Sequence, residues 1–121
     1  PAYAGYAGSV RGAAVVEGSV SAGSRLGIPG GPKIGASGGP GAGKVFAEDI
    51  KDAARTEAGN VCVFCGTPTT RQPGPTQSHI DHAQPKVRGG NNTLENAQNT
   101  CRTCNLSKGT KNTVEFLGER N

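Results

Sequence analysis

Four cysteines and two histidines are the residues of this 121-residue chain whose types and spacing point to chemistry. Cys62 and Cys65 form one Cys-x-x-Cys pair, and Cys101 and Cys104 form a second. Such a gap lets both sulfurs of a turn point at one ion, so two pairs complete a tetrahedral site suited to Zn²⁺. The alternative is two disulfides in a secreted protein. We favour zinc, because such pairs bridge poorly over long distances and the chain lacks the cysteine density of a secreted mini-scaffold.

A closed four-thiolate site has no open coordination position, so its expected role is structural. The site would fix Cys62, at the start of the segment, against Cys104, at its end. Any catalytic chemistry must therefore come from residues that this clamp holds in place.

Both histidines of the chain, His79 and His82, lie on either side of Asp81 in the segment 79–86. Neutral imidazole suits the removal of a proton from water, and carboxylate and amide oxygens suit Mg²⁺ or Mn²⁺. Phosphodiester hydrolysis needs such a base and a cation that offsets charge on the phosphorane and the leaving oxygen. His82, Asp81 and Asn105 supply these groups. Side chains alternate along a strand, so Asp81 and His82 would need a bend or a strand end near residue 83 to act on one phosphate.

Together these residues resemble the motif of the HNH endonucleases, in the zinc-bearing form of the ββα-metal (His-Me finger) nucleases. The resemblance covers residues 62–111 and rests on Asp81, His82, Pro85, Gly89, Gly90, Asn96, Cys101, Cys104, Asn105, Lys108 and Gly109. It implies an endonuclease that hydrolyses DNA and leaves 5′-phosphate and 3′-hydroxyl ends.

The resemblance also implies a role for each site residue. Asp81 and Asn105 would bind one catalytic divalent ion, and His82 would activate the water. Asn96 would orient the loop that carries His82. Asn105 stands where the last histidine of the motif often lies, which points to Mg²⁺ or Mn²⁺ as the ion. His79 is left open between a phosphate contact, assistance to the metal and simple exposure beside the site.

Basic residues around the motif favour a polyanionic substrate. The chain carries a net charge of +4, and residues 71–111 hold six basic residues against two acidic ones. Contacts of this kind position the phosphate backbone without reading bases, although any one residue could lie on an ordinary solvated face. We expect nucleic-acid contacts from Lys86, Arg88, Arg102, Lys108 and Lys111. The sequence shows no aromatic platform or recognition helix, so we expect little sequence preference.

The elements that must position these residues follow from local patterns. Helical spacing from Phe46 to Ala54, with Gly59 just past the end, predicts a helix before the first cysteine pair. Strands are expected at residues 78–83 and 96–100, a turn at 89–92, and a short helix at 102–111. The predicted fold class is therefore a small α+β protein with a ββα-metal core and a four-cysteine structural zinc. Because only 33% of the residues are hydrophobic, a metal is a plausible aid to a small core.

Residues 1–44 differ from the rest in composition, since they hold 13 of the 20 glycines. Ordering such a segment loses much backbone entropy for little apolar area, so it is expected to be a flexible or partner-ordered arm or linker. Residues 45–121 are then the nuclease domain. Residues 38–44 match the start of a phosphate-binding loop, but Val45 replaces the usual Ser or Thr, and we treat the match as chance.

A glycine- and alanine-rich arm before a small HNH domain is similar in architecture to the C-terminal toxin domains of bacterial polymorphic toxins, including Rhs-type and type VI secretion effectors. The resemblance implies a cognate immunity protein and attachment to a larger N-terminal delivery protein. It places the action in the cytoplasm of a target bacterium.

The termini and composition add three expectations. The sequence has no apolar run long enough to span a membrane and no Sec-type signal, so no membrane partner is expected. It lacks methionine, so we expect a fragment, a processed product or a trimmed chain. The alternatives to a toxin are a phage or housekeeping HNH nuclease, and a non-catalytic zinc module that binds nucleic acid or protein.

Overall fold

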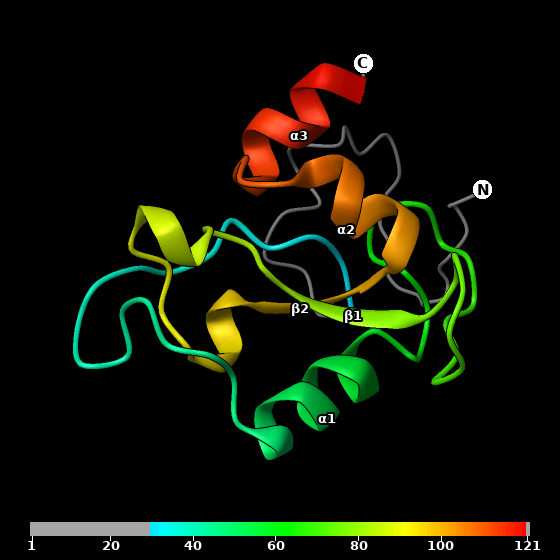
Figure 1. The fold of residues 1–121 in the computed structure, drawn as a ribbon, viewed down its shortest axis with the longest axis horizontal. Helices are drawn as coiled ribbons and strands as arrows, with labels where there is room; N and C mark the ends of the chain where they lie inside the picture. The colour runs from blue at the N-terminus through cyan, green and yellow to red at the C-terminus, as the bar shows by residue number, and fades with distance from the viewer. Residues whose placement is uncertain (1–29, 121) are drawn as a thin grey trace.

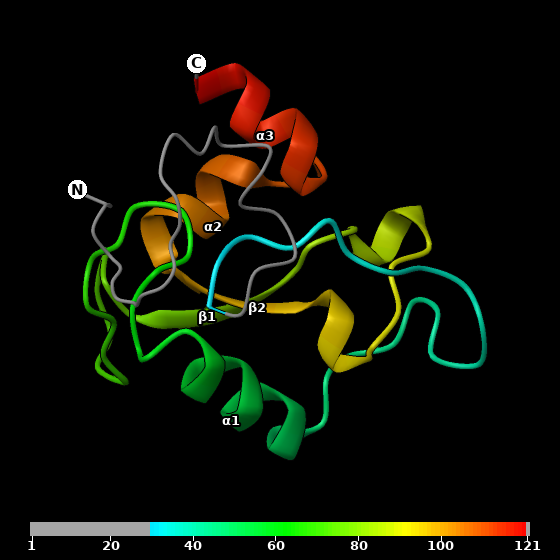
Figure 2. The same ribbon diagram turned by 180° about the vertical axis from the view of Figure 1, so that it is seen from behind.

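A two-stranded antiparallel sheet lies between helices on its two faces in the computed structural model of the chain (Figure 1). The structure describes residues 30–120. Its elements are α1 (Glu48–Glu57), β1 (Ser78–His82), η3 (Lys86–Arg88), η4 (Leu94–Asn96), β2 (Ala97–Cys101), α2 (Arg102–Lys108) and α3 (Thr113–Arg120). Figures 1 and 2 show α1 on one side of the sheet and α2, with α3 beyond it, on the other. The predicted fold class, a small α+β protein with a ββα arrangement, is confirmed.

The register of the sheet brings the motif residues of β1 to those of β2. Asp81 pairs with Gln98 and His82 pairs with Ala97 at one end, while Ser78 pairs with Cys101 at the other. Because α2 begins directly after Cys101, this zinc ligand and His82 lie at opposite ends of the two-stranded sheet. β1 ends at His82, one residue before the expected end.

Helix α1 forms where helical spacing predicts it. Glu48 and Asp49 occupy its first turn, where the helix dipole favours anions, and the chain leaves the helix through Gly59, whose φ is +60°. The helix buries Ala54 against the sheet, in an apolar cluster with Phe46 and Ala97 that Ile50, Ile80 and Leu94 extend. This cluster forms the core on the α1 face.

A second apolar cluster surrounds the cysteines on the other side of the molecule. Val63, Phe64 and Phe116 pack there with the sulfur-bearing residues, and the rings of Phe64 and Phe116 meet edge to face at 5.0 Å. Phe116 comes from α3, a helix for which the sequence analysis made no prediction. Helix α3 thus covers the cysteine cluster with the Phe116 side chain.

Residues 30–44, here called the strap, run along the domain instead of leaving it. Hydrogen bonds join Gly38 to Gly89 and Gly43 to Gly90. The Lys33 amide donates to the Gln98 side chain. The boundary expected between residues 44 and 45 thus divides a unit that the structure keeps together, while residues 1–29 lie outside the described part.

A glycine in the strap allows the backbone to pack closely against the rest of the domain. Gly35 has a φ of +102°, and a Cβ atom there would lie 2.7 Å from both the Asn96 Oδ1 atom and the Gln84 amide nitrogen. A glycine-rich composition can therefore reflect tight packing as well as a linker. Within residues 30–120, no helix is long and apolar enough to cross a lipid bilayer.

Candidate active site and zinc centre

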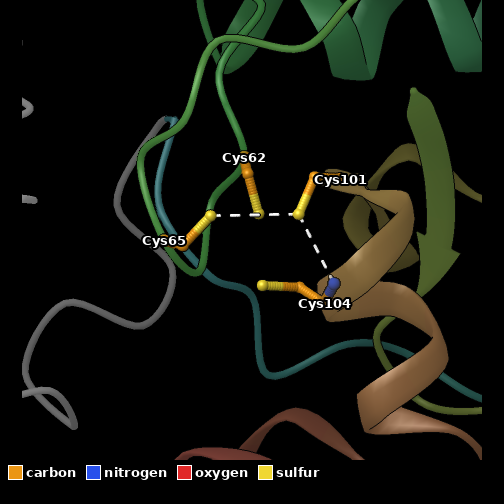
Figure 3. Close-up of side chains that lie close together, drawn as sticks. All are labelled: Cys62, Cys65, Cys101 and Cys104. Carbon is orange, nitrogen blue, oxygen red and sulfur yellow. Dashed lines mark hydrogen bonds between the residues drawn. The ribbon is translucent and has the colours of Figure 1, made fainter. Parts of the chain in front are cut away.

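The four cysteine side chains converge on one point between the turn that carries Cys62 and Cys65 and the start of α2 (Figure 3). Their Sγ atoms all lie within 4.8 Å of one another, and the Cys65 and Cys101 sulfurs are 3.9 Å apart. Four thiolates held tetrahedrally at about 2.3 Å from Zn²⁺ would be just under 4 Å apart. The geometry therefore fits the predicted structural zinc site, with Cys62, Cys65, Cys101 and Cys104 as its ligands.

The hydrogen bonds and the pKa values of the cysteine thiols also fit a site that binds a cation. The Phe64 amide donates to the Cys62 sulfur and the Cys104 amide to the Cys101 sulfur, both at 3.4 Å. A hydrogen bond from Cys104 lowers the pKa of Cys62 to about 5, whereas burial raises the pKa of Cys65 to about 11. The protein alone thus favours the thiolate at Cys62 and the thiol at Cys65, and a divalent ion would favour the thiolate at both.

Asp81 lies at the centre of the second cluster, on the face of β1 that α2 covers. Its side chain is only 6% exposed and receives hydrogen bonds from Gln98 at 2.9 Å and Asn105 at 3.2 Å. The Lys108 ammonium group lies 3.1 Å from its Oδ2 atom. Burial raises the pKa of the Asp81 carboxyl above its ordinary value, and Lys108 partly offsets this effect.

Asp81 and Asn105 fit the role of ligands to one divalent ion. The Asn105 amide nitrogen is 3.2 Å from Asp81 Oδ1, and a half-turn of the amide would place its oxygen there instead. Two oxygens on adjacent octahedral positions, each about 2.1 Å from Mg²⁺, are about 3 Å apart. The Asp81 and Asn105 side chains are therefore in direct contact, and with the amide turned they would offer two oxygens at about the separation of adjacent Mg²⁺ or Mn²⁺ ligands.

His79, two residues before Asp81 on the same strand, also reaches this cluster. Its Nδ1 atom lies 3.3 Å from the Asn105 Oδ1 atom. Three roles were left open for His79. Its contact with Asn105, a candidate metal ligand, is the one expected if His79 assists the metal. That contact holds the Asn105 amide from the side opposite Asp81.

His82 faces the other side of β1, as strand alternation requires. Its ring stacks on Phe46, with ring centres 3.9 Å apart, and its Nε2 atom lies 3.0 Å from the Lys44 carbonyl oxygen. A carbonyl oxygen only accepts, so Nε2 carries the proton and Nδ1 has the free lone pair. Within the described residues no hydrogen bond to Nδ1 is formed, which leaves this atom available as a base.

The Asp81 and His82 side chains point to opposite sides of the strand, and Lys108 links their positions. The Lys108 Nζ atom donates to the Asp81 carboxylate and, at 3.1 Å, to the His82 carbonyl oxygen. β1 ends at His82, so both residues lie at the C-terminal end of this strand.

Asn96 is placed where it can hold the loop after His82. The side chain is fully buried, and its Oδ1 atom accepts from the amides of Gln84, at 2.8 Å, and Ala36, at 3.1 Å. Its Nδ2 atom donates to the carbonyl oxygens of Gln84 and Asn91. The Asn96 side-chain amide thus forms four hydrogen bonds, which connect the loop after His82 with the strap.

The basic residues are distributed differently from the expectation. Lys86 and Arg102 are exposed and form no ion pair within residues 30–120, so both remain available to phosphates. Arg88 instead pairs with Glu115 at 2.6 Å, and Lys111 pairs with Glu119 at 3.5 Å. Both acidic partners belong to α3 and so lie outside residues 71–111, in which basic residues outnumber acidic ones.

Lys108 requires a correction, because its fully buried side chain does not face solvent and cannot serve as a surface phosphate contact. Its ammonium group neutralises Asp81 inside the domain. The sequence held a signal for this burial: Lys108 follows Cys104 by four residues, so both lie on one face of α2.

We expect Lys108→Met to lower the free energy of unfolding by about 3–5 kcal/mol, because it leaves the Asp81 carboxylate buried without its cation. The measurement is urea unfolding of the zinc-loaded protein without added Mg²⁺ or Mn²⁺, either of which would itself neutralise Asp81. The exposed Lys86→Met is the matched control, with an expected change within about 0.5 kcal/mol. Equal stability of the two variants would contradict the assignment of Lys108 to a buried ion pair.

The environment of His82 gives an expected pH dependence. Desolvation lowers the pKa of His82 below its ordinary value of 6.5; the Lys44 carbonyl opposes this effect, while Lys86 and Lys108 reinforce it. Since a base must be neutral, His82 should keep its proton-accepting form to a pH below 6.5. An NMR titration of the zinc-loaded protein should give a midpoint below that of the same histidine in the urea-unfolded chain. A midpoint at or above the unfolded value would show that the desolvation is absent.

Three participants were not identified from the sequence. Gln98 supports Asp81 from the neighbouring strand, and it also donates to Thr113 at 3.1 Å. Lys44 and Phe46 support His82 from before α1. Helical spacing identified Phe46 as core, but nothing in the sequence indicates that its ring meets a histidine 36 residues later.

Comparisons with known proteins agree with this geometry. Neither the search of curated proteins nor that of solved structures gave a match. One family model matches, and it spans both cysteine pairs, β1, β2 and α2. A metal-dependent nuclease activity is what that family implies. The segment of this chain that carries both clusters, residues 62–111, matches the HNH endonuclease family.

Proposed function

We propose that this protein is an endonuclease that hydrolyses phosphodiester bonds of DNA with one divalent cation and little sequence preference. The observation that carries the proposal is the placement of the matched motif. Asp81 and Asn105 are in direct contact through their side chains, and His82 has a free Nδ1 atom at the end of the same strand.

Each group then has one task in the proposed reaction. His82 accepts a proton from the attacking water at Nδ1, while its Nε2–H group continues to donate to the Lys44 carbonyl oxygen. Asp81 and Asn105 would hold a divalent cation, which would neutralise charge on the phosphorane and the leaving 3′ oxygen. Asn96 keeps the loop after His82 in place. The products would carry 5′-phosphate and 3′-hydroxyl ends.

A nucleic-acid substrate is proposed on the basis of charge, and weak sequence preference on the basis of what the site lacks. Exposed Lys86 and Arg102 provide contacts of the kind that bind the phosphate backbone. Helix α2 spans seven residues, and it commits Cys104, Asn105 and Lys108 to the two metal clusters. Few side chains of α2 are therefore free to contact base edges, which supports the proposal of weak sequence preference.

The test is cleavage of supercoiled plasmid by the zinc-loaded full chain with Mg²⁺ or Mn²⁺. We expect nicked and then linear products, loss of cleavage when the divalent ion is withheld, and ends scattered over many sequences. Parallel reactions with single-stranded DNA and with RNA decide the substrate class. Protein that retains zinc and fails to cut any of these polymers with either ion would instead support a non-catalytic zinc module.

We also propose, on the composition of residues 1–44, that this nuclease acts as an antibacterial toxin held in check by an immunity protein. An acidic partner that covers Lys86 and Arg102 would fit the charge of the site. Expression of the wild-type chain in a bacterial cytoplasm should arrest growth, whereas an inactive variant should not. If the wild-type protein cleaves DNA in the test tube but leaves growth unchanged, the toxin role is wrong and a housekeeping nuclease is favoured.

A further inference from the structure

Phe46 lies before the residues that match the HNH family, yet its ring covers the candidate base. The two rings are stacked with centres 3.9 Å apart and planes inclined by 17°. Phe46 is only 5% exposed and packs with Ala54 and Ala97 in the core on the α1 face. The core therefore fixes the Phe46 ring, and the Phe46 ring provides a rigid flat surface for the imidazole of His82.

The Lys44 carbonyl, two residues earlier, fixes a second property of the same imidazole. It accepts the Nε2 proton of His82 at 3.0 Å and so selects one neutral tautomer. Its position is set by the strap, in which Lys44 donates its own amide to Gly41 and Gly43 donates to Gly90, at 3.1 and 3.0 Å. Stacking orients the plane of the ring, while the hydrogen bond determines which nitrogen is the base.

We propose that Phe46, together with the Lys44 carbonyl, is a positioning element that holds His82 as its Nε2–H tautomer with Nδ1 as the proton acceptor. The kinetic consequence rests on the proposed nuclease function. The tautomer itself is a property of the folded protein and can be measured whether or not the protein cleaves DNA.

Leucine at position 46 would fill most of the apolar volume but would remove the flat face. The imidazole could then rotate away from the Lys44 carbonyl and populate both tautomers. A base displaced by about 1 Å can lose about 100-fold in rate, so we expect Phe46→Leu to lower kcat about 10- to 100-fold with KM little changed.

The experiment compares three full-length, zinc-loaded proteins: the wild type, Phe46→Leu and Ile50→Ala. Ile50 packs against the same apolar cluster as Phe46, so its truncation loosens that core without removing the stacked ring. Nitrogen-15 NMR of the histidine side chains, above the pKa of His82, reports which ring nitrogen is protonated. Plasmid cleavage gives kcat and KM for the same samples.

The expected result is one Nε2–H tautomer of His82 in the wild type and in Ile50→Ala, and a mixture in Phe46→Leu, which alone loses kcat. Three results would overturn the inference: an Nδ1–H or mixed tautomer in the wild type, an unchanged tautomer in Phe46→Leu, or an equal loss in Ile50→Ala. If Phe46→Leu does not fold, Phe46→Met, which also lacks a flat ring, replaces it in both measurements. If the wild type does not cleave DNA, the nuclease proposal fails while the NMR comparison decides this one.

Discussion

His82→Ala should abolish plasmid cleavage and leave a folded, zinc-loaded protein. A positioned general base contributes about 10²- to 10⁴-fold to a rate, and the Nδ1 atom of His82 is the free imidazole nitrogen at the end of β1. The ring stacks on Phe46 but lies away from the cysteines, so its loss should not release zinc. The measurements are the initial cleavage rate with Mg²⁺, the zinc content and the far-UV circular dichroism spectrum of each protein.

Added imidazole provides the matched control for this variant. It can enter the space left by the side chain and should restore part of the rate in His82→Ala, while it leaves the wild-type rate unchanged. A His82→Ala protein that cleaves within a few-fold of the wild type would remove His82 from the role of base. The proposed metal site at Asp81 would then need another proton acceptor.

Cys62→Ser should have the largest effect on stability, because it removes one ligand of the structural zinc site. Structural zinc contributes an apparent binding free energy of about 10–16 kcal/mol, while whole domains are stable by about 5–15 kcal/mol. The apolar core around the site is small, and the cysteines are themselves among its members. We therefore expect loss of stoichiometric zinc and of cooperative unfolding, followed by loss of cleavage.

Thr103→Ser is the control, since this exposed residue lies beside Cys104 without being a ligand. It should retain one zinc ion per chain and unfold as the wild type does. A strong chelator should reproduce the effect of Cys62→Ser in the wild-type protein. Retention of full zinc content and a cooperative transition in Cys62→Ser would show that the fourth sulfur is dispensable.

Spacing in the sequence was enough to predict the features that depend on local geometry. The two Cys-x-x-Cys pairs required only a turn each, and both strands lie within a residue or two of their expected bounds. The motif placed Asp81 and Asn105 correctly near each other, because the hairpin and the following helix leave little freedom between them. These inferences rest on spacing within a turn, a strand or a hairpin and the helix that follows it.

The features that spacing did not reveal depend on contacts between distant segments. Lys108 was expected on the surface because lysine is rarely buried, but the Asp81 carboxylate offers it an internal partner. The pairing of Arg88 with Glu115 depends on where α3 packs, which no local pattern specifies. The strap was expected to be loose because glycine is costly to order, yet Gly35 is what lets it approach Asn96.

The strap also bears on how such a domain could be exchanged between genes. A recombination event that began at Cys62 would transfer the complete zinc site and the whole matched segment. It would leave behind the Lys44 carbonyl and the Phe46 ring, together with α1, which packs against the sheet. On the proposed function, the segment that carries the chemistry therefore begins before the matched residues and includes Lys44 and Phe46. Selection on catalysis should act on that segment as strongly as on the motif.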